Sequence, residues 1–312
     1  MSGIYNLVRV MPGMEILPGA LRSPFLTASR LYYQLSGGRR GPPILEEDWD
    51  TLLILDGCRY DLFERRCSLN GRLERRRSLG STTDQFVRAN FDSDTFEDLV
   101  YVSANPRVDL AFEGAFHASK QVWRDGWDDD LETVPPEPVV EVAHEAHEEY
   151  PHKRIIVHFI QPHAPFIGDI GQERLREHST LADHRPSADG TDTDNIWDLV
   201  AVGAVDRDDV LQAYEENLNL VLGAVVDLLD SINGRTVITS DHGNLVGERL
   251  PPFFRRSYGH PTGLYAPGLV EVPWFVVESD TRREIVAGET FESDDVTVTE
   301  STKEKLKSLG YR

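Results

Sequence analysis

Cysteine is nearly absent from this sequence, which has two in 312 residues. They are Cys58 and Cys67, and neither belongs to a CxxC or a CxxC…H pattern. A fold held together by disulfides needs more cysteines, and a cysteine-type zinc site needs closely spaced ones. The sequence therefore argues against both, and it is typical of a protein from a reducing compartment.

Lysine is also scarce, because five of the 32 basic residues are lysine and the rest are arginine. Acidic residues number 53, so the formal net charge is −21. Nucleic-acid affinity comes largely from basic side chains that neutralise phosphates, so this charge argues against a nucleic-acid-binding protein. An acidic, lysine-poor surface stays soluble at high salt, where its self-repulsion is screened. We therefore expect a halophilic protein from a high-salt cytoplasm.

Long apolar runs are missing as well. No stretch is long enough to span a bilayer, and the N-terminus lacks a basic-then-apolar signal peptide, so we expect a soluble, cytoplasmic protein.

A cluster of glycine, arginine and proline at 37–43 separates an N-terminal appendage, 1–43, from a catalytic domain, 44–312. Residues 1–40 mix apolar and arginine side chains, which is compatible with a peripheral membrane contact, but a helix packed on the domain is the simpler interpretation.

The sequence is rich in β-branched runs that alternate with helical patterns. Strands are predicted at 52–55, 99–103, 154–160 and 236–239, and a long amphipathic helix at 208–232 precedes the last of them. This alternation predicts an α/β fold with a mostly parallel sheet. The polar stretch 178–194 is predicted to be a surface loop or lid.

Two of the predicted strands stop at a carboxylate. The first ends at Asp56 and the last at Asp241-His242, each followed by glycine. Because parallel α/β sheets bind ligands outside the carboxyl ends of their strands, the two segments should meet at one site. Two carboxylates and an imidazole suit zinc, manganese or a similar divalent cation. Helix capping is the ordinary alternative for both aspartates, but it does not require His242.

Six short sequence motifs occur along the chain in an order that can be compared with known families. They are Asp56-Gly57-Cys58-Arg59-Tyr60-Asp61, Gln161-Pro162-His163-Ala164-Pro165-Phe166, Tyr214-Glu215-Glu216-Asn217-Leu218, Ser240-Asp241-His242-Gly243, Gly259-His260-Pro261-Thr262-Gly263-Leu264-Tyr265 with Val272-Pro273, and Lys305-Leu306-Lys307-Ser308-Leu309-Gly310-Tyr311. Together they resemble the alkaline phosphatase and sulfatase superfamily, and more closely sulfatase-like proteins of haloarchaeal type. The resemblance covers the chain from about Trp49 onward. It implies a three-layer α/β/α sandwich and an enzyme that hydrolyses or transfers sulfate or phosphate esters.

The resemblance also implies a nucleophile. Sulfatases carry a cysteine or serine in a C/S-x-P-x-R frame that is oxidised to formylglycine, and this chain has no such frame. In the family's order the nucleophile follows the first strand, where this chain has Ser81-Thr82-Thr83. The alignment places Thr83 at the nucleophile, with Ser81 as the alternative.

The implied metal ligands are an acid, the nucleophilic threonine and an Asp-His pair, here Asp56, Thr83, Asp241 and His242. One divalent ion per chain (Mn, Zn, Ca or Mg) is expected, because the D-x-x-x-H pair of two-metal relatives is absent from the sequence. His184, Asp192 and Asp194 of the predicted lid are further candidate ligands.

A cation at this site would lower the pKa of the Thr83 hydroxyl, which could then attack phosphorus or sulfur. We expect His163 and His260 on the substrate side, as hydrogen-bond donors or as the acid for the leaving group. We expect the Arg59 side chain to contact either the ester or the core beside the helix that follows it. The expected substrate is a small-molecule or glycan ester.

A second function class is a non-catalytic, sulfatase-like binding or scaffold protein. The missing formylglycine frame would fit this alternative. The presence of five convergent polar groups argues against it, because a scaffold gains nothing from desolvating them.

Overall fold

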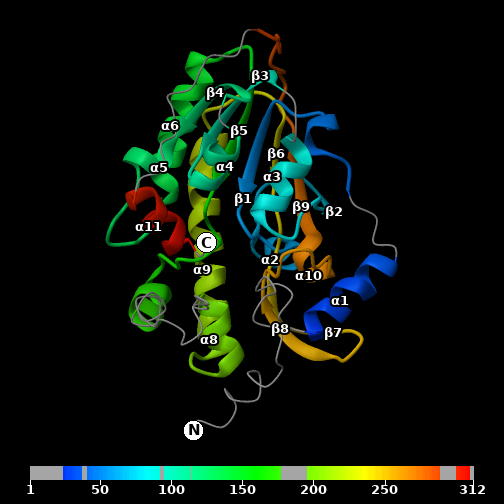
Figure 1. Cartoon of the computed structure of the whole chain (residues 1–312). Helices are drawn as coiled ribbons and strands as arrows, with labels where there is room; N and C mark the ends of the chain where they lie inside the picture. The colour runs from blue at the N-terminus through cyan, green and yellow to red at the C-terminus, as the bar shows by residue number, and fades with distance from the viewer. Residues whose placement is uncertain are drawn as a thin grey trace.

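The structure is a computed structural model that describes residues 24–36, 41–91, 95–112, 114–176, 195–288 and 300–309. Its centre is a seven-stranded sheet with the strand order β2-β9-β6-β1-β5-β3-β4 (Figure 1). The strands are β1 (Thr51–Leu55), β2 (Arg72–Arg77), β3 (Phe96–Ser103), β4 (Phe116–Gln121), β5 (Arg154–Phe159), β6 (Thr236–Thr239) and β9 (Glu271–Val277). The five strands from β6 to β4 are parallel, whereas β9 runs antiparallel to both β6 and β2.

Strand β1 shows why helices cover both faces of the sheet. Leu53 and Leu55 belong to one apolar cluster, and Leu52 and Ile54 belong to another. Successive side chains of a strand point to opposite faces, so both faces of β1 are apolar and must be buried. One face packs against α2 (Tyr60–Arg66), α5 (Val122–Asp125), α6 (Pro136–Glu149), α8 (Ile196–Val202) and α9 (Arg207–Leu229), and the other against η3 (Ile44–Glu46), α3 (Thr83–Phe91) and α4 (Pro106–Ala111). The predicted three-layer α/β/α sandwich with a mostly parallel sheet is confirmed.

A hairpin unit lies at the carboxyl ends of the parallel strands (Figure 1). It consists of α1 (Pro24–Leu35), β7 (Leu245–Leu250) and α10 (Pro267–Val270), which share a third apolar cluster, and of β8 (Arg255–Gly259), which pairs with β7. The Ser29 hydroxyl donates a hydrogen bond to the carbonyl of Pro251 at 2.6 Å, which fixes α1 to the hairpin. No helix in the described ranges is long and apolar enough to cross a membrane.

Two elements remain, a π-helical turn η4 (Gly171–Leu175) and α11 (Glu300–Ser308). Lys305 of α11 donates to the carbonyl of Trp123 at 2.9 Å, which ties the helix to α5. The predicted lid with His184, Asp192 and Asp194 lies outside the described residues, as do residues 1–23 of the predicted appendage. The boundary between residues 43 and 44 stays a prediction.

Candidate active site

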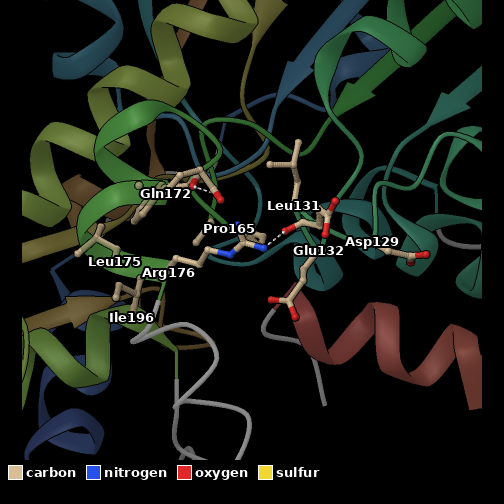
Figure 2. A pocket seen from close by; sticks show the side chains of 12 residues that line it. Asp129, Leu131, Glu132, Pro165, Gln172, Leu175, Arg176 and Ile196 are labelled. Atoms are coloured by element: carbon tan, nitrogen blue, oxygen red, sulfur yellow. Dashed lines mark hydrogen bonds between the residues drawn. The ribbon is translucent and has the colours of Figure 1, made fainter.

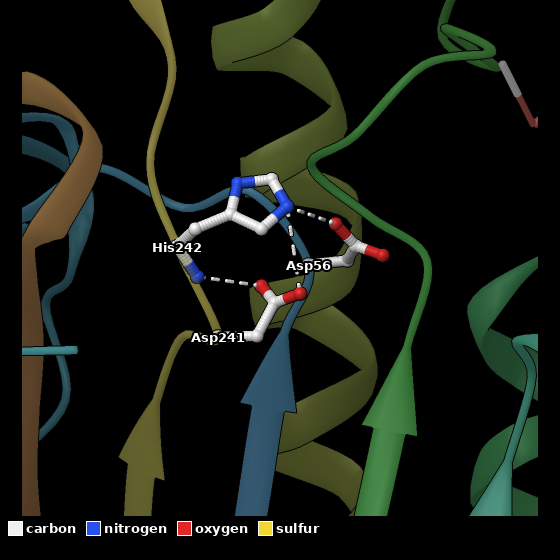
Figure 3. A group of neighbouring side chains, drawn as sticks. All are labelled: Asp56, Asp241 and His242. Atoms are coloured by element: carbon white, nitrogen blue, oxygen red, sulfur yellow. Dashed lines mark hydrogen bonds and ion pairs between the residues drawn. The ribbon is translucent and has the colours of Figure 1, made fainter. Parts of the chain in front are cut away.

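Two carboxylates meet because their strands are neighbours. Asp56 directly follows β1, and Asp241 follows β6 after one residue, while Ile54 pairs with Thr239 across the two strands. Figure 3 shows Asp56, Asp241 and His242 pointing toward one another beyond the strand ends. All three are buried, and their ligand atoms lie within 4.8 Å of one another, so they form a possible metal site.

Thr83 supplies a fourth oxygen from the start of α3. Its hydroxyl donates to Asp241 Oδ2 at 2.7 Å and lies 3.5 Å from Asp56 Oδ2 and 3.4 Å from His242 Nε2. The side chain is fully buried. The first turn of α3 therefore presents a hydroxyl, and not a charged group, to the two carboxylates.

Ser81, the alternative nucleophile, has a different environment. Its hydroxyl donates to Gln85 Oε1 at 2.9 Å and accepts from the Gly263 N–H at 2.9 Å. These bonds join the start of α3 to the loop that follows His260. The structure thus brings Thr83 to the carboxylates and gives Ser81 partners that belong to the framework.

The orientation of the His242 ring makes the site suitable for a cation. Its Nδ1 lies 2.8 Å from the carbonyl oxygen of Gly243, which can only accept, so Nδ1 carries the proton. In the neutral ring Nε2 therefore presents a lone pair, and it lies 3.5 Å from a carboxylate oxygen of Asp56 and of Asp241. Converging lone pairs on one nitrogen and several oxygens are the donor set of a Zn²⁺ or Mn²⁺ site.

The surroundings of Asp241 favour its charged form. Burial alone would raise the pKa of this carboxyl, but His242, His158 and hydrogen bonds from the Gly57 N–H and the Thr83 hydroxyl hold the pKa below its ordinary value. The Gly57 N–H donates to Asp241 Oδ1 at 3.0 Å. A charged carboxylate is the form that binds a cation.

Gly57 is needed for the tight turn after β1. Its φ is +68°, in the left-handed region that glycine adopts without strain. A Cβ at this position would lie 3.4 Å from Asn244 Nδ2 and 3.5 Å from His163 Cδ2. The turn therefore brings the chain close to two further polar side chains of the site.

His163 and His260, predicted to face the substrate, lie side by side. The Nδ1 of His163 lies 2.6 Å from the carbonyl oxygen of Ala164, so Nδ1 carries the proton and Nε2 accepts. Its partner at 3.1 Å is His260 Nε2, which must therefore donate. Burial lowers the pKa of His163 to about 4, and burial with the nearby His242 and His163 lowers the pKa of His260 well below its usual range. Both rings are neutral at pH 7, with a defined proton on His260 Nε2.

Arg59, a predicted substrate-binding residue, has its guanidinium bonded within the protein. Its Nε lies 2.7 Å from Asp61 Oδ1, and its Nη1 donates to the Asn244 carbonyl at 2.6 Å and to Glu248. The contacts with Asn244 and Glu248 anchor the segment that follows His242. The structure therefore shows Arg59 joining α2 to this loop.

Two asparagines lie at the site or support it without having been predicted to do so, although Asn217 belongs to the motif at 214–218. The amide Nδ2 of Asn105, at the end of β3, donates to Asp56 Oδ2 at 3.2 Å. Asn217, on α9, bonds three backbone groups of the loop that carries His163. Two sequence patterns could have pointed to them. Asn105 is a polar residue shortly after a predicted strand, and Asn217 is a polar residue on the apolar face of the long predicted helix.

Asn244 has a buried amide beside these groups. The residue is 1% exposed, and neither polar atom of its side chain has a hydrogen-bond partner among the described residues. Leaving such an amide unpaired costs about 1–3 kcal/mol. The amide lies close to Gly57 and His163 and so is suited to bind a ligand there.

A pocket of about 100 Å³ lies beside the His163 loop (Figure 2). Its walls combine the apolar residues that follow His163 with charged side chains of the loop after α5 and of the turn η4. The lining includes Ala164, Pro165, Phe166, Asp129, Glu132 and Arg176. Ala164 links the pocket to the chain directly after His163, and none of the candidate catalytic residues lines it.

Comparisons with known proteins give matches only among solved structures. No protein-family model and no curated protein matches the chain. The soluble domain of lipooligosaccharide phosphoethanolamine transferase A from Neisseria meningitidis is 12% identical, with a TM-score of 0.47, over 74% of this chain and 76% of that one. The zinc complex of the periplasmic domain of EptC from Escherichia coli is 13% identical, with a TM-score of 0.44, over 77% of each chain. A protein of the alkaline phosphatase superfamily from Vibrio parahaemolyticus is 12% identical, with a TM-score of 0.40, over 79% of this chain and 62% of that one.

Proposed function

We propose that this protein is a metal-dependent enzyme that hydrolyses or transfers a phosphate or sulfate ester, with Thr83 as the nucleophile. The observation that carries the proposal is the Thr83 hydroxyl, which lies within 3.5 Å of Asp56, Asp241 and His242. A hydroxyl needs activation to act as a nucleophile, and a divalent cation held by these three residues would lower its pKa.

The chain's own groups orient the reacting atoms in the remaining steps. The Thr83 hydroxyl donates a hydrogen bond to the charged Asp241 Oδ2, which orients it, and its proton passes to water as the oxygen attacks. Thr83 Oγ1 attacks phosphorus or sulfur, and the bond from that atom to the leaving oxygen breaks. The leaving oxygen accepts a hydrogen bond from the neutral His260 Nε2–H, which His163 orients, and takes its proton from water. Water or an acceptor alcohol then releases the ester from Thr83.

Substrate binding is assigned to the groups that surround this centre. The Asn244 amide donates to a non-bridging oxygen of the ester, which would satisfy its unpaired Nδ2. The part of the substrate beyond the ester group is assigned to the pocket that Ala164, Pro165 and Phe166 line, on the chain directly after His163. Its mixed apolar and charged walls suit a small-molecule or glycan ester.

Metal analysis of the purified protein, combined with turnover of p-nitrophenyl phosphate, phosphodiester and sulfate, tests the proposal. We expect about one divalent ion per chain and turnover of one ester class with Mn²⁺, Zn²⁺, Mg²⁺ or Ca²⁺. Asp241→Ala should lose both metal and turnover, whereas Asp227→Ala, an exposed aspartate on α9, should lose neither. Wild-type protein without metal or turnover would favour the binding or scaffold function instead.

The choice of nucleophile has its own test. Thr83→Ala should lower kcat by a factor of at least about 10³ and leave most of the metal affinity, because Asp56, Asp241 and His242 remain. Thr83→Ser should restore part of the activity, since it keeps a hydroxyl. Ser81→Ala, the matched control, should lose less than tenfold. The reverse order of effects would assign the nucleophile to Ser81.

A further inference from the structure

The turn of the β7–β8 hairpin carries two exposed aromatic side chains. Phe253 is 63% exposed and Phe254 is 61% exposed. The φ of Phe254 is +53°, a left-handed backbone conformation that strains a bulky residue and that glycine or asparagine adopts readily. The turn therefore keeps an aromatic residue where the backbone favours a small one, which points to a role for the ring itself.

The charge around this turn is opposite to that of the molecule. Residues 24–36 and 249–256 contain four arginines and no acidic residue, although the whole chain has a formal charge of −21. Arg249, Arg255 and Arg256 are exposed. We call Phe253, Phe254, Arg255 and Arg256 the aromatic tip. It is a basic and apolar surface on an acidic protein.

Helix α1 extends the exposed apolar surface. Leu31 is 54% exposed and Leu35 is 77% exposed, and they lie four residues apart, on one face of the helix. The opposite face contacts the hairpin, where the Phe25 and Phe253 rings lie 6.5 Å apart. The aromatic tip and the outer face of α1 thus belong to one structural unit, α1 with the hairpin, and exposed apolar side chains gathered on one unit mark an interaction site.

The hairpin joins this surface to the candidate active site. At its base Leu245 pairs with Gly259, directly beside Asn244 and His260. At its far end Leu250 pairs with Arg255, next to the aromatic tip. Five residues of strand span about 17 Å, at about 3.3 Å per residue. The tip therefore projects from the end of the molecule that holds the site (Figure 1).

We propose that the aromatic tip and the outer face of α1 dock on the surface of an anionic lipid bilayer. Aromatic rings are stable at the boundary between headgroups and acyl chains, and arginines beside them pair with anionic headgroups. The acidic remainder of the molecule is repelled by the same headgroups, which turns the basic tip toward the lipid. The fixed turn then inserts the two phenyl rings without reorganising the fold.

Vesicle co-sedimentation of the full chain tests this docking. We expect at least tenfold tighter binding to vesicles of phosphatidylcholine with phosphatidylglycerol than to phosphatidylcholine alone. Phe253→Ser with Phe254→Ser should weaken binding to the anionic vesicles at least tenfold. Arg255→Gln with Arg256→Gln should weaken it about fivefold per arginine at low salt and reduce its salt dependence.

A matched control separates this surface from general hydrophobicity. Val286 is 48% exposed and lies beside His152, near the start of β5 and at the opposite end of the sheet, so Val286→Ser should bind vesicles as the wild type does. Unchanged thermal unfolding midpoints would show that all variants are folded. The proposal would be overturned if the wild-type protein did not co-sediment with anionic vesicles. It would also be overturned if the variant without both phenyl rings bound them as tightly as the wild type does. A lipid-free dimer that the phenylalanine variant abolishes would assign the surface to a second copy instead.

Discussion

Asp109 is a buried carboxyl group outside the candidate active site. Ser119 Oγ donates to one of its oxygens, and Trp123 Nε1 donates to the other at 2.9 Å. Burial raises the pKa of Asp109 to about 6 despite these bonds. The pKa is lower in the unfolded chain, so protonation favours the folded state. This stabilisation is complete below about pH 4, the pKa of an unperturbed aspartate, and is lost as the pH rises through 6.

We expect Asp109→Asn to remove this pH dependence. The amide oxygen can accept from Trp123 and the amide nitrogen can donate to Ser119, so both hydrogen bonds survive without a buried charge. Relative to the wild type, the variant should gain up to about 3 kcal/mol of stability between pH 4 and pH 7. Urea unfolding of both proteins at pH 4, 5, 6 and 7 measures the difference. A constant difference across this range would contradict the assignment.

At the scale of elements, α9 holds the loop that carries His163. Asn217 donates to the carbonyls of His163 at 3.2 Å and Pro165 at 3.0 Å, and it accepts from the Ile167 N–H at 2.8 Å. The residue is fully buried, so no water replaces a lost bond easily. One side chain thus satisfies three backbone groups of a loop that has no regular structure.

Asn217→Ala should destabilise the fold by about 3 kcal/mol, because it leaves buried backbone groups unpaired and opens a cavity. The loop should also become more mobile. Because His163 would then lose its fixed position, turnover of the ester substrates should fall. The control is Asn219→Ala, an exposed position on the same helix that should change stability by less than about 0.5 kcal/mol. Guanidinium unfolding and steady-state kinetics report the two effects. Equal effects at the two positions would exclude the proposed tether.

The sequence predicts the central strands better than the edge strands. Strands β1, β5 and β6 are rich in apolar and β-branched residues because both faces are covered, so the sequence alone marks them and their polar ends. Strand β2 has the sequence RLERRR, which has no apolar run, and it is a strand because it pairs along its whole length with β9. Strand β4, FHASKQ, is the other edge and depends in the same way on β3. Long-range pairing of this kind leaves no local pattern.

The candidate site likewise combines features that the sequence predicts with features that depend on the tertiary structure. Asp56 and Asp241 are predictable because each ends an apolar strand, and neighbouring parallel strands bring them together. The hydrogen bond between His163 and His260 joins residues 97 positions apart, and no spacing in the sequence indicates it. The guanidinium of Arg59 bonds partners on a loop that only the folded chain brings near. Position at a strand end can be predicted, whereas the partner of a loop side chain requires the tertiary structure.

For the whole molecule, the formal charge of −21 predicts a dependence on salt. Unscreened repulsion among acidic side chains destabilises a compact state, and the Debye length falls from about 10 Å at 0.1 M to about 3 Å at 1 M salt. Raising KCl from 0.1 M to 2 M should increase the thermal unfolding midpoint by at least about 3 °C, which corresponds to about 2 kcal/mol for a chain of this length. The increase should shrink near pH 5, where the net charge is close to zero. A midpoint that KCl leaves unchanged at pH 7.5 would show that the acidic surface does not limit stability.

The distance along the chain between the site residues decides when the site can exist. Thr83 and Asp241 are 158 residues apart, and β6, which ends just before Asp241, must slot between β1 and β9. Ribosomes add about 5–20 residues per second, so roughly 10–30 s separate the synthesis of the two side chains. A growing chain therefore displays Asp56 and Thr83 long before their partners emerge. If the proposed site holds a cation, it can do so only late in biogenesis, and a retained ion would report that synthesis and folding are complete.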